Sequence, residues 1–356
     1  MFTKFFQKPT QQQQQQQQQR NEAEGSLTPA DFNPRIDFHY GIPSTASILA
    51  FDSIQSLLAI GTLDGRIKVI GGDNVEGLLV SPKQLPFKNL EFLQNQGFLA
   101  SVSSDNEIQV WDLENRVLAS ALQWGSNITS FSVIYGTSYM YIGSEHGDVT
   151  VLKYYADDRK ILQLPYYIPA NIISDEDGMS LPDQLSVIGV LHQPCSPGNR
   201  ILVAYENGLI ILWDASEDQV VLVRGSKDLE LKYKTVVDCV KGTKHDLPDH
   251  LSNQNQMEKE ISSLCWASEN GSVLAVGYVD GDIVFWDISN DVSSKDWGPE
   301  ESADSVVKLQ LASGNRRLPV IVLHWSMTGS CNHQGGQLFV YGGDQIGSEE
   351  VLTVWF

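Results

Sequence analysis

The sequence lacks the features of membrane, secreted and nucleic-acid-binding proteins. No apolar run approaches the roughly 18 residues that cross a bilayer, and the N-terminus has no apolar segment of a secretory signal. Basic residues are scarce, 24 against 44 aspartates and glutamates, so the net charge of −20 repels phosphate backbones and anionic lipids. We therefore expect a cytoplasmic protein, at most peripheral at the plasma membrane, that does not bind nucleic acid.

Cysteine is also scarce, and its spacing excludes two common uses. No C-x-x-C pair occurs, and the four cysteines are widely separated: Cys195, Cys239, Cys265 and Cys331. Such spacing fits neither a disulfide framework nor a zinc site. We expect reduced thiols in a cytosolic protein and no bound metal.

Motifs that indicate catalysis are absent as well. The sequence contains no G-x-x-x-x-G-K-[ST], G-x-G-x-x-G, G-x-S-x-G or H-E-x-x-H. Its histidines and carboxylates form no spacing that a reaction requires. We predict no enzymatic activity, no catalytic residue and no cofactor. An enzyme whose site is assembled from residues far apart in the sequence is a third hypothesis.

The sequence does contain a repeat, in which a tight turn precedes an alternating apolar strand. The copies read LDGRIKVI, SDNEIQVWD, EHGDVTVLK, ENGLIILWD and VDGDIVFWD. In each copy the second turn residue stands five positions before a bulky apolar residue, which gives the pairs Gly65 and Ile70, Asn106 and Trp111, Gly147 and Leu152, Gly208 and Trp213, and Gly281 and Trp286. Glycine and asparagine tolerate positive φ, so these turns suit antiparallel hairpins.

Two more apolar strands precede each turn, as SVLAVGY and ISSLCWA do in the last regular copy. Three strands and a variable outer strand make one propeller blade, and the Trp-Asp pairs match the WD signature. We predict an all-β, WD40-type β-propeller in which the tryptophans pack between blades. Its structural repeat positions are Asp64, Gly65, Asp105, Trp111, Asp112, Gly147, Gly208, Trp213, Asp214, Asp280, Gly281, Trp286 and Asp287.

A sixth, divergent unit runs from VIVLHWS at Val320 to VLTVWF at the end of the sequence. About six blades are therefore visible, and we expect part of a seven-bladed propeller that is truncated at its C-terminal end. Residues 35–356 are assigned to this incomplete propeller. Residues 1–34 are predicted to be disordered, because an unbroken glutamine run at 11–19 has no apolar side chains to bury. An unclosed ring is expected to aggregate through an unpaired sheet edge.

Insertions lengthen the later units. The stretch from Arg224 to Lys244 concentrates basic residues in an acidic chain, which makes it a candidate contact surface for a partner. The residues chosen for this role are Arg224, Lys227, Lys232 and Lys234. A solvated loop is the alternative interpretation, because charged insertions usually have no partner.

The stretch GIPSTASILAFDSIQSLLAIGTLDGRIKVIG, from Gly41 to Gly71, resembles the opening blade of the lethal giant larvae and tomosyn family. The resemblance continues in LEFLQNQGFLASVSSDNEIQVWDL, ILVAYENGLIILWD and FVYGGDQIGSEEVLTVWF, and the tomosyn-like branch is the more similar. It implies a non-enzymatic cytosolic regulator of vesicle docking and exocytosis. The implied partners are syntaxin-type SNAREs and proteins of the Rab and exocyst pathways.

The chain departs from this family in one respect, and a rival function stays open. Family members resemble two stacked seven-bladed propellers followed by a tail. The sequence shows neither the second propeller nor the sustained heptads of a SNARE-like coil, so inhibition through such a coil is not expected of it. The rival is a WD40 scaffold of another class, a ubiquitin-ligase substrate receptor or a signalling platform, because propeller faces accept many partners.

Overall fold

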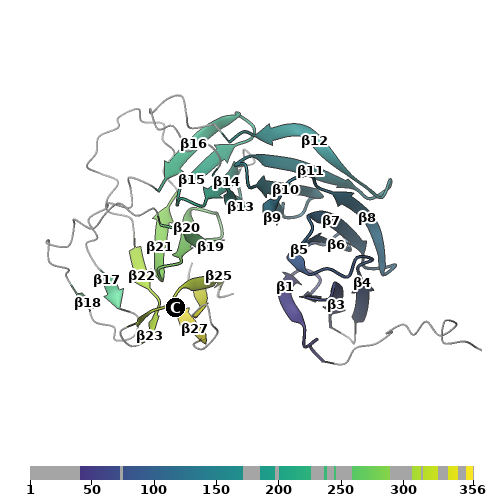
Figure 1. Cartoon of the computed structure of the whole chain (residues 1–356). Coiled ribbons are helices and arrows are strands. Elements are labelled where there is room, and N and C mark those ends of the chain that lie inside the picture. The colour runs from purple at the N-terminus through teal and green to yellow at the C-terminus, as the bar shows by residue number, and fades with distance from the viewer. Residues whose placement is uncertain are drawn as a thin grey trace, which may run out of the picture. The chain divides into compact units, whose positions relative to one another are not determined.

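The computed structural model describes residues 41–72, 75–170, 185–196, 200–225, 236–238, 244–245, 259–288, 307–313, 316–327, 336–343 and 350–355. The chain divides into two compact units, Met1–Gly41 and Ile42–Phe356, and the description concerns the second. Within the described residues this unit is all-β, with no helix (Figure 1). The predicted disordered segment 1–34 and the boundary at residue 35 lie outside the described residues.

The first four blades are four-stranded antiparallel sheets whose strands pair in chain order. Blade 1 contains β1 (Ala46–Asp52), β2 (Leu57–Thr62), β3 (Arg66–Ile70) and β4 (Glu76–Val80). Blade 2 contains β5 (Phe87–Leu93), β6 (Phe98–Ser103), β7 (Glu107–Asp112) and β8 (Val117–Gln123). Blade 3 contains β9 (Ile128–Val133), β10 (Tyr139–Ser144), β11 (Val149–Tyr155) and β12 (Lys160–Ile168). Blade 4 contains β13 (Val187–His192), β14 (Arg200–Tyr205), β15 (Ile210–Asp214) and β16 (Gln219–Arg224).

Blades 5 and 6 depart from this plan. Blade 5 contains β19 (Ile261–Trp266), β20 (Val273–Tyr278), β21 (Asp282–Asp287) and β22 (Val307–Gln310). Its outer edge is extended by β17 (Val236–Asp238), which pairs in parallel with β22, and by β18 (Lys244–His245). A short hairpin, β23 (Ala312–Ser313) with β24 (Arg316–Arg317), precedes blade 6. Blade 6 contains β25 (Val320–Met327), β26 (Gly336–Gly343) and β27 (Glu350–Trp355).

The prediction of an all-β WD40-type propeller with about six blades is confirmed. In and next to the basic insertion, residues 236–238 and 244–245 form strands at the edge of blade 5, so these residues are not the loop of the alternative interpretation. The predicted contact surface for a partner is not tested by this and stays a prediction. The seventh blade that the sequence analysis expects is not among the described residues, and it stays a prediction.

The tight turns form as the repeat predicts. Their second residues all have positive φ: Gly65 (73°), Asn106 (65°), Gly147 (89°), Gly208 (90°) and Gly281 (89°). Glycine is also required at Gly65 and Gly281 because the segment that leads to the next blade packs directly against the turn and leaves no room for a side chain. A Cβ at Gly65 would lie 2.5 Å from the Gln84 Cα, and one at Gly281 would lie 2.6 Å from the Leu318 carbonyl oxygen.

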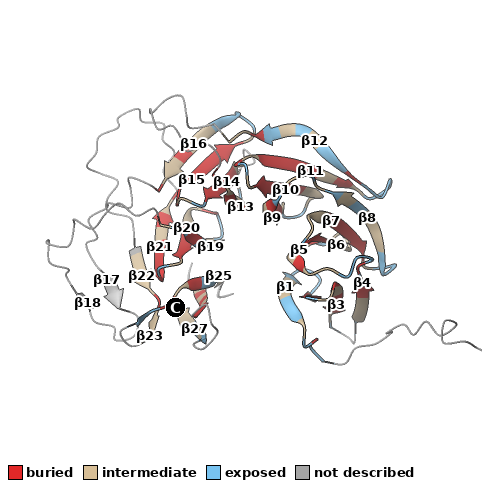
Figure 2. Cartoon of the chain, in the orientation of Figure 1, coloured by how far each residue is buried: buried red, intermediate tan, exposed pale blue. Residues whose placement is uncertain are grey.

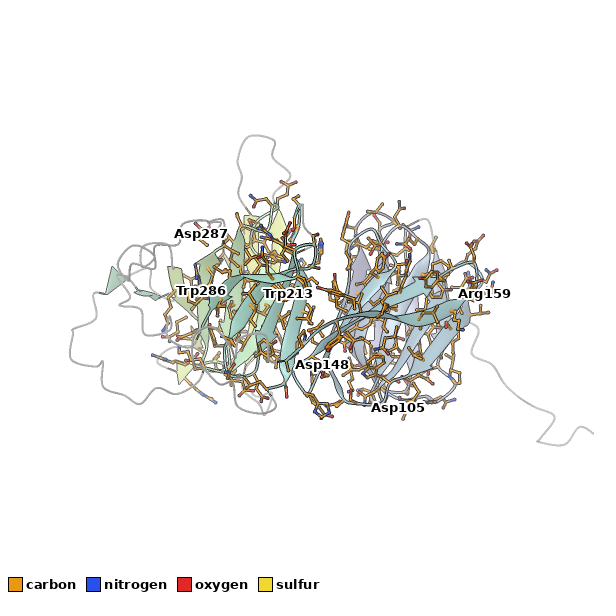
Figure 3. The ribbon with its side chains drawn as sticks, turned by 90° about the horizontal axis from the view of Figure 1, so that it is seen from above. Asp105, Asp148, Arg159, Trp213, Trp286 and Asp287 are labelled. Atoms are coloured by element: carbon orange, nitrogen blue, oxygen red, sulfur yellow. The ribbon has the colours of Figure 1, made fainter. Side chains whose placement is uncertain are left out.

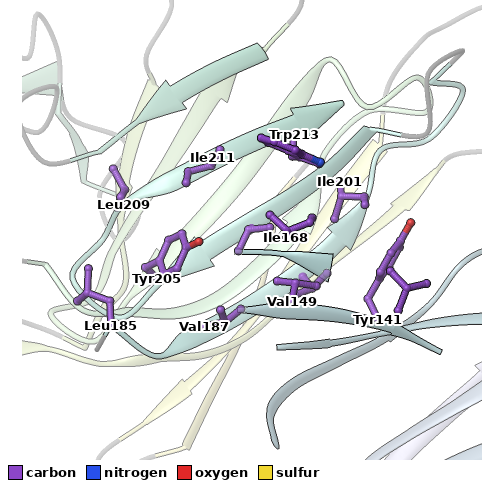
Figure 4. Packing of buried hydrophobic residues seen from close by; sticks show 13 residues of the cluster. Tyr141, Val149, Ile168, Leu185, Val187, Ile201, Tyr205, Leu209, Ile211 and Trp213 are labelled. Atoms are coloured by element: carbon purple, nitrogen blue, oxygen red, sulfur yellow. The ribbon is translucent and has the colours of Figure 1, made fainter. Parts of the chain in front are cut away.

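Five hydrophobic clusters join consecutive blades, because successive side chains of a strand point to opposite sheet faces and each inner sheet therefore has two apolar faces. Figure 2 shows this burial along the middle strands. Trp111 belongs to the cluster between blades 1 and 2, and Trp286 to the one between blades 4 and 5. Figure 4 shows the cluster between blades 3 and 4, where Tyr141 and Trp213 lie. Among the described residues, no such cluster joins blade 6 to blade 1.

Candidate functional site

The two ends of the blades differ in chemistry. The turns between the second and third strands of blades 1 to 5 lie at one end, which we call the turn face. It carries the predicted repeat positions Asp64, Gly65, Asp105, Gly147, Gly208, Asp280 and Gly281. The aspartates of the Trp-Asp pairs end the third strands and lie at the opposite end. In Figure 3, Asp105 and Asp148 accordingly lie on the opposite side from Asp287.

Asp112 and Asp214, the aspartates of two of the Trp-Asp pairs, accept hydrogen bonds from the turns that follow them. Asp112 Oδ1 accepts a hydrogen bond from the Asn115 backbone N–H at 2.9 Å. Asp214 Oδ1 accepts one from the Ser216 N–H at 2.9 Å, and Asp214 Oδ2 accepts one from Arg200 Nε at 3.3 Å. These carboxylates are occupied by the chain itself, so we assign them a structural role.

The three tryptophans of these pairs are buried, but their indole N–H groups differ. Trp111 Nε1 donates to Ser101 Oγ at 2.9 Å within blade 2. Trp213 Nε1 donates to the Tyr166 hydroxyl of blade 3 at 2.7 Å, which links two blades. Trp286 Nε1 has no hydrogen-bond partner among the described residues.

Lys83 organises the turn face of blade 2. It lies in the connection that precedes blade 2, and its Nζ lies 2.7 Å from Asp105 Oδ2 and 3.1 Å from Glu107 Oε1. The same Nζ donates to Gln123 Oε1 at 2.8 Å. Hydrogen bonds to Asp105 and Glu107 raise the pKa of Lys83. Partial burial opposes ionisation of Asp105, but the bonds from Lys83 and Ser103 outweigh it and lower its pKa.

Blade 5 repeats this arrangement with more burial. Asp282 is fully buried; Lys308 Nζ lies 2.5 Å from its Oδ2, and Gln310 Nε2 donates to its Oδ1 at 2.9 Å. Lys259 also pairs with Asp282, and its Nζ lies 2.9 Å from Asp280 Oδ2. Burial opposes ionisation of Asp282, yet hydrogen bonds from Lys259 and Lys308 hold its pKa below the usual range.

Blade 1 fixes its turn in the same way. Thr45 Oγ1 donates to Asp64 Oδ1 at 3.0 Å, and Arg66 forms an ion pair with the same carboxylate. Hydrogen bonding, with Thr62 as the largest cause, lowers the pKa of Asp64 to about 2. Asp64, Asp105 and Asp282 are therefore ionised and paired at neutral pH.

The fixed charges of the turn face are suited to binding a partner, and the described side chains there do not identify a reactive group. No cluster of three or more histidine, cysteine, aspartate or glutamate side chains in the described part of the chain has the geometry of a metal site. The same residues contain no helix that is long and apolar enough to cross a membrane. Exposed side chains at the turn face include Leu63 and His146, next to Asp64 and Glu145.

The predicted basic contact surface is described only at its beginning. Arg224 ends β16, is half-buried, and its Nη1 donates to the Val223 carbonyl at 3.1 Å. Lys227, Lys232 and Lys234 lie outside the described residues. Their role in partner binding stays a prediction.

The sequence analysis also missed Glu91, a partly buried titratable group of blade 2. Glu91 lies on β5, and its Oε2 accepts a hydrogen bond from the Val133 N–H of blade 3 at 2.6 Å. Burial raises the pKa of Glu91 to about 7, although the Val133 N–H favours the ionised form. The sequence does contain a sign of this group, because Glu91 is the only charged residue in the apolar segment LEFL.

The comparisons with known proteins agree with the fold. The family described as "WD domain, G-beta repeat" matches residues 245–287, which end at the Trp-Asp pair of blade 5. The β-propeller domain of Cps50 (Swd1) from Myceliophteria thermophila is similar in structure, with a TM-score of 0.59 and 14% identity, and the match covers 90% of this chain and 85% of that one. This likeness concerns the fold alone.

The sequence is also similar to curated proteins of one kind, the lethal giant larvae proteins. The chain is 26% identical over 214 residues to LLGL scribble cell polarity complex component 2 of Homo sapiens, which covers 53% of this chain and 20% of the relative. It is 23% identical over 287 residues to the same component of Mus musculus, covering 74% and 24%. It is 22% identical over 282 residues to Lethal(2) giant larvae protein homolog 1 of Homo sapiens, covering 72% and 23%.

The matched part of this chain spans about a quarter or less of the length of these relatives. The match nevertheless extends over several blades and agrees with the WD40 repeat and with the propeller fold. The chain thus contains a WD40 repeat and is similar to lethal giant larvae proteins, while the tomosyn branch stays a prediction.

Proposed function

We propose that this chain is a non-enzymatic protein-interaction scaffold in SNARE-dependent vesicle docking and exocytosis. In this proposal it binds syntaxin-type SNAREs and proteins of the Rab and exocyst pathways, in the cytoplasm and peripherally at the plasma membrane. Its support is the similarity to lethal giant larvae proteins, together with the scaffold character of WD40 propellers. Two of the relatives are named as components of a cell polarity complex, which agrees with a role in directed membrane delivery.

The turn face is the surface that supports this proposal within the chain. Its carboxylates are held by lysines and arginine, as Asp105 is by Lys83 and Asp64 by Arg66, so they are oriented before a partner arrives. Leu63 is 56% exposed beside them. A pre-oriented polar rim around an exposed apolar side chain lowers the ordering cost of association.

The test is direct binding of the whole chain to the cytoplasmic domain of a syntaxin-type SNARE and to a GTP-loaded Rab protein, measured by calorimetry. Leu63→Asp and His146→Glu alter the turn face without removing an ion pair of Lys83 or Asp282. Each is expected to weaken binding about tenfold or more if it replaces a central contact. Glu114→Lys, in the exposed turn after β7 at the opposite end, is the matched control and should bind as the unaltered chain does.

Absence of binding to every SNARE, Rab and exocyst protein would remove the proposal. The rival function, a WD40 scaffold of another class, predicts a different result of proximity labelling in cells. Enrichment of ubiquitin-ligase or signalling subunits, without secretory proteins, would favour the rival. Loss of binding in Glu114→Lys but in neither turn-face variant would move the site to the other end of the blades.

A further inference from the structure

The outer strand of each blade has one edge that faces away from the rest of its sheet. In blade 5 this edge is occupied, because β17 pairs with β22 in parallel, with Val237 opposite Leu309. Among the described residues, β4 of blade 1 has no such partner and ends the order β1-β2-β3-β4. Figure 1 shows β4 at the periphery of blade 1 and β17 at the periphery of blade 5. Blade 5 thus demonstrates that the outer edge of a blade in this chain accepts an additional strand.

The register identifies the backbone groups of β22 that hold β17. Hydrogen-bonded pairs alternate with non-bonded pairs along an antiparallel ladder, and the Leu311 N–H donates to the Gly281 carbonyl oxygen at 2.8 Å at the end of this one. The alternation therefore directs the N–H and C=O groups of Lys308 and Gln310 away from β21. These two residues are the ones opposite which the ends of β17 lie.

Strand β4 presents the same groups in the same places. The Ser81 N–H donates to the Gly65 carbonyl oxygen at 2.8 Å, so Leu78 and Val80 direct their N–H and C=O groups away from β3. They occupy the positions that bind β17 in blade 5, counted from the residue that donates to the turn glycine. No hydrogen bond among the described residues uses these outward groups. An unpaired edge of this kind is a template for an added strand.

A β-bulge interrupts the other free outer edges and is absent from β4. The ladders that join β8, β12 and β16 to their neighbours each contain a register shift. The ladder of β3 with β4 contains none, from the pair of Arg66 with Val80 to the pair of Ile70 with Glu76. Bulges twist an edge away from regular pairing and are one way in which proteins protect edge strands. The edge of β4 is therefore regular, as is that of β22, which has no register shift with β21.

The two faces of β4 differ in chemistry. Val80 is 48% exposed, and Leu78 is half-buried on the same face. On the other face Gly77 leaves room, because a Cβ there would meet only Arg116 Nε, at 4.0 Å. Arg116 is exposed in the turn after β7, and no carboxylate pairs with it among the described residues. A strand added beside β4 therefore meets apolar side chains on one face and a guanidinium group on the other.

We propose that the outer edge of β4 binds an extended segment of a partner protein by strand addition. The segment has apolar residues at alternate positions, against Leu78 and Val80, and a carboxylate on its other face, directed at Arg116. Backbone hydrogen bonds to the edge supply affinity, and the alternate side chains supply specificity. This contact uses the backbone of β4 instead of the turn-face side chains Leu63 and His146, so it goes beyond the proposed function and does not depend on it.

The test is binding of a labelled synthetic peptide of about nine residues to the whole chain, measured by fluorescence anisotropy. The peptide alternates threonine with valine and has glutamate at its centre. We expect binding, slower hydrogen exchange at the Leu78 and Val80 amides, and loss of binding when the peptide is N-methylated at alternate residues. Arg116→Glu should weaken binding at least about tenfold, and Arg116→Lys should retain most of it.

Val80→Pro removes an outward N–H without removing a hydrogen bond to β3, and it should also weaken binding at least about tenfold. Ala121→Pro is the matched control, because the Ala121 N–H likewise points away from β7 in the bulged strand β8. This control should bind as the unaltered chain does. Near-ultraviolet circular dichroism checks the fold of both proline variants, and Arg116→Glu tests the site if either unfolds.

Absence of binding overturns the proposal, as does equal weakening by the two proline variants. Slow exchange of the Leu78 and Val80 amides in the free, dilute chain also overturns it, because a segment of the chain itself would then cover the edge. A dimer of the whole chain that Val80→Pro abolishes overturns it as well, because the occupant would then be a second copy.

Discussion

The indole N–H of Trp111 illustrates how much one buried hydrogen bond contributes. Ser101→Ala removes its only acceptor in the described structure and leaves a buried donor without a partner. We expect the free energy of unfolding to fall by about 1–3 kcal/mol. Urea unfolding followed by tryptophan fluorescence measures the change. An unchanged midpoint would mean that Trp111 does not depend on Ser101.

Blade 5 allows the reverse experiment. Val276 stands where Ser101 stands in blade 2, and it pairs with Val284, two residues before Trp286. Val276→Thr places a hydroxyl where the unpartnered Trp286 N–H can use it. Threonine in a buried valine site normally costs stability, so Val110→Thr in blade 2 is the matched control. We expect Val276→Thr to be more stable than this control by about 1 kcal/mol, and equal losses would contradict the argument.

Glu91 gives the fold a pH dependence with a definite sign. Its pKa rises from the ordinary value of 4.5 to about 7 in the folded chain, because burial disfavours the charged form. A folded pKa above the unfolded value means that the stabilising contribution is full below about pH 4.5 and is lost as the pH rises through about 7. Glu91→Gln keeps an oxygen acceptor for the Val133 N–H and removes the titration.

We therefore expect Glu91→Gln to match the unaltered chain near pH 4.5 and to be more stable at pH 8, by on the order of 2–3 kcal/mol. Chemical unfolding at both pH values measures this difference. Glu114→Gln, in an exposed turn, is the control for loss of one negative charge. A Glu91→Gln chain whose stability follows the same pH profile as the unaltered chain would show that Glu91 does not titrate in this window.

At the scale of elements, the turns depend on glycine for both conformation and space. Gly281 has a φ of 89°, and a Cβ there would lie 2.6 Å from the Leu318 carbonyl oxygen. Gly281→Ala is expected to lower the free energy of unfolding by on the order of 2 kcal/mol. Gly72→Ala is the matched control, because a Cβ at Gly72 has no atom within 4 Å. Equal thermal midpoints for the two variants would contradict this explanation.

The regular strands were predictable because their signals are local. The turn residues and the alternating apolar positions lie within a few residues of each other, so the five regular copies and their turns follow from the sequence. The edge strand β17 was not predictable, because it pairs with β22 across a long insertion. Strand pairing of this kind has no periodic signature in the chain.

At the turn face, too, the local features were predictable from the sequence and the long-range contacts were not. Asp105 and Asp280 were identified from the repeat, but their lysine partners were not. Lys83 lies 22 residues from Asp105, and Lys259 lies 23 residues from Asp282, in connections that have no repeat. Only the fold brings these side chains together, so the sequence predicts Asp105 and Asp280 but neither lysine, and it does not predict Asp282.

At the scale of the whole molecule, stability depends on how many neighbours a blade has. Among the described residues, blades 2 to 5 share a hydrophobic cluster with the blade on each side, whereas blades 1 and 6 share one cluster each. Repeated units of this kind gain most of their stability from the interfaces between neighbours. The end blades should therefore open at a lower free energy than the middle ones.

Hydrogen exchange followed by mass spectrometry tests this expectation. In dilute solution, amides of β1–β4 and β25–β27 should exchange earlier than those of β9–β12 and β13–β16, because opening an end blade breaks one apolar interface and opening a middle blade breaks two. Equal protection of all blades in dilute solution would contradict the expectation, because the end faces would then be covered within one copy.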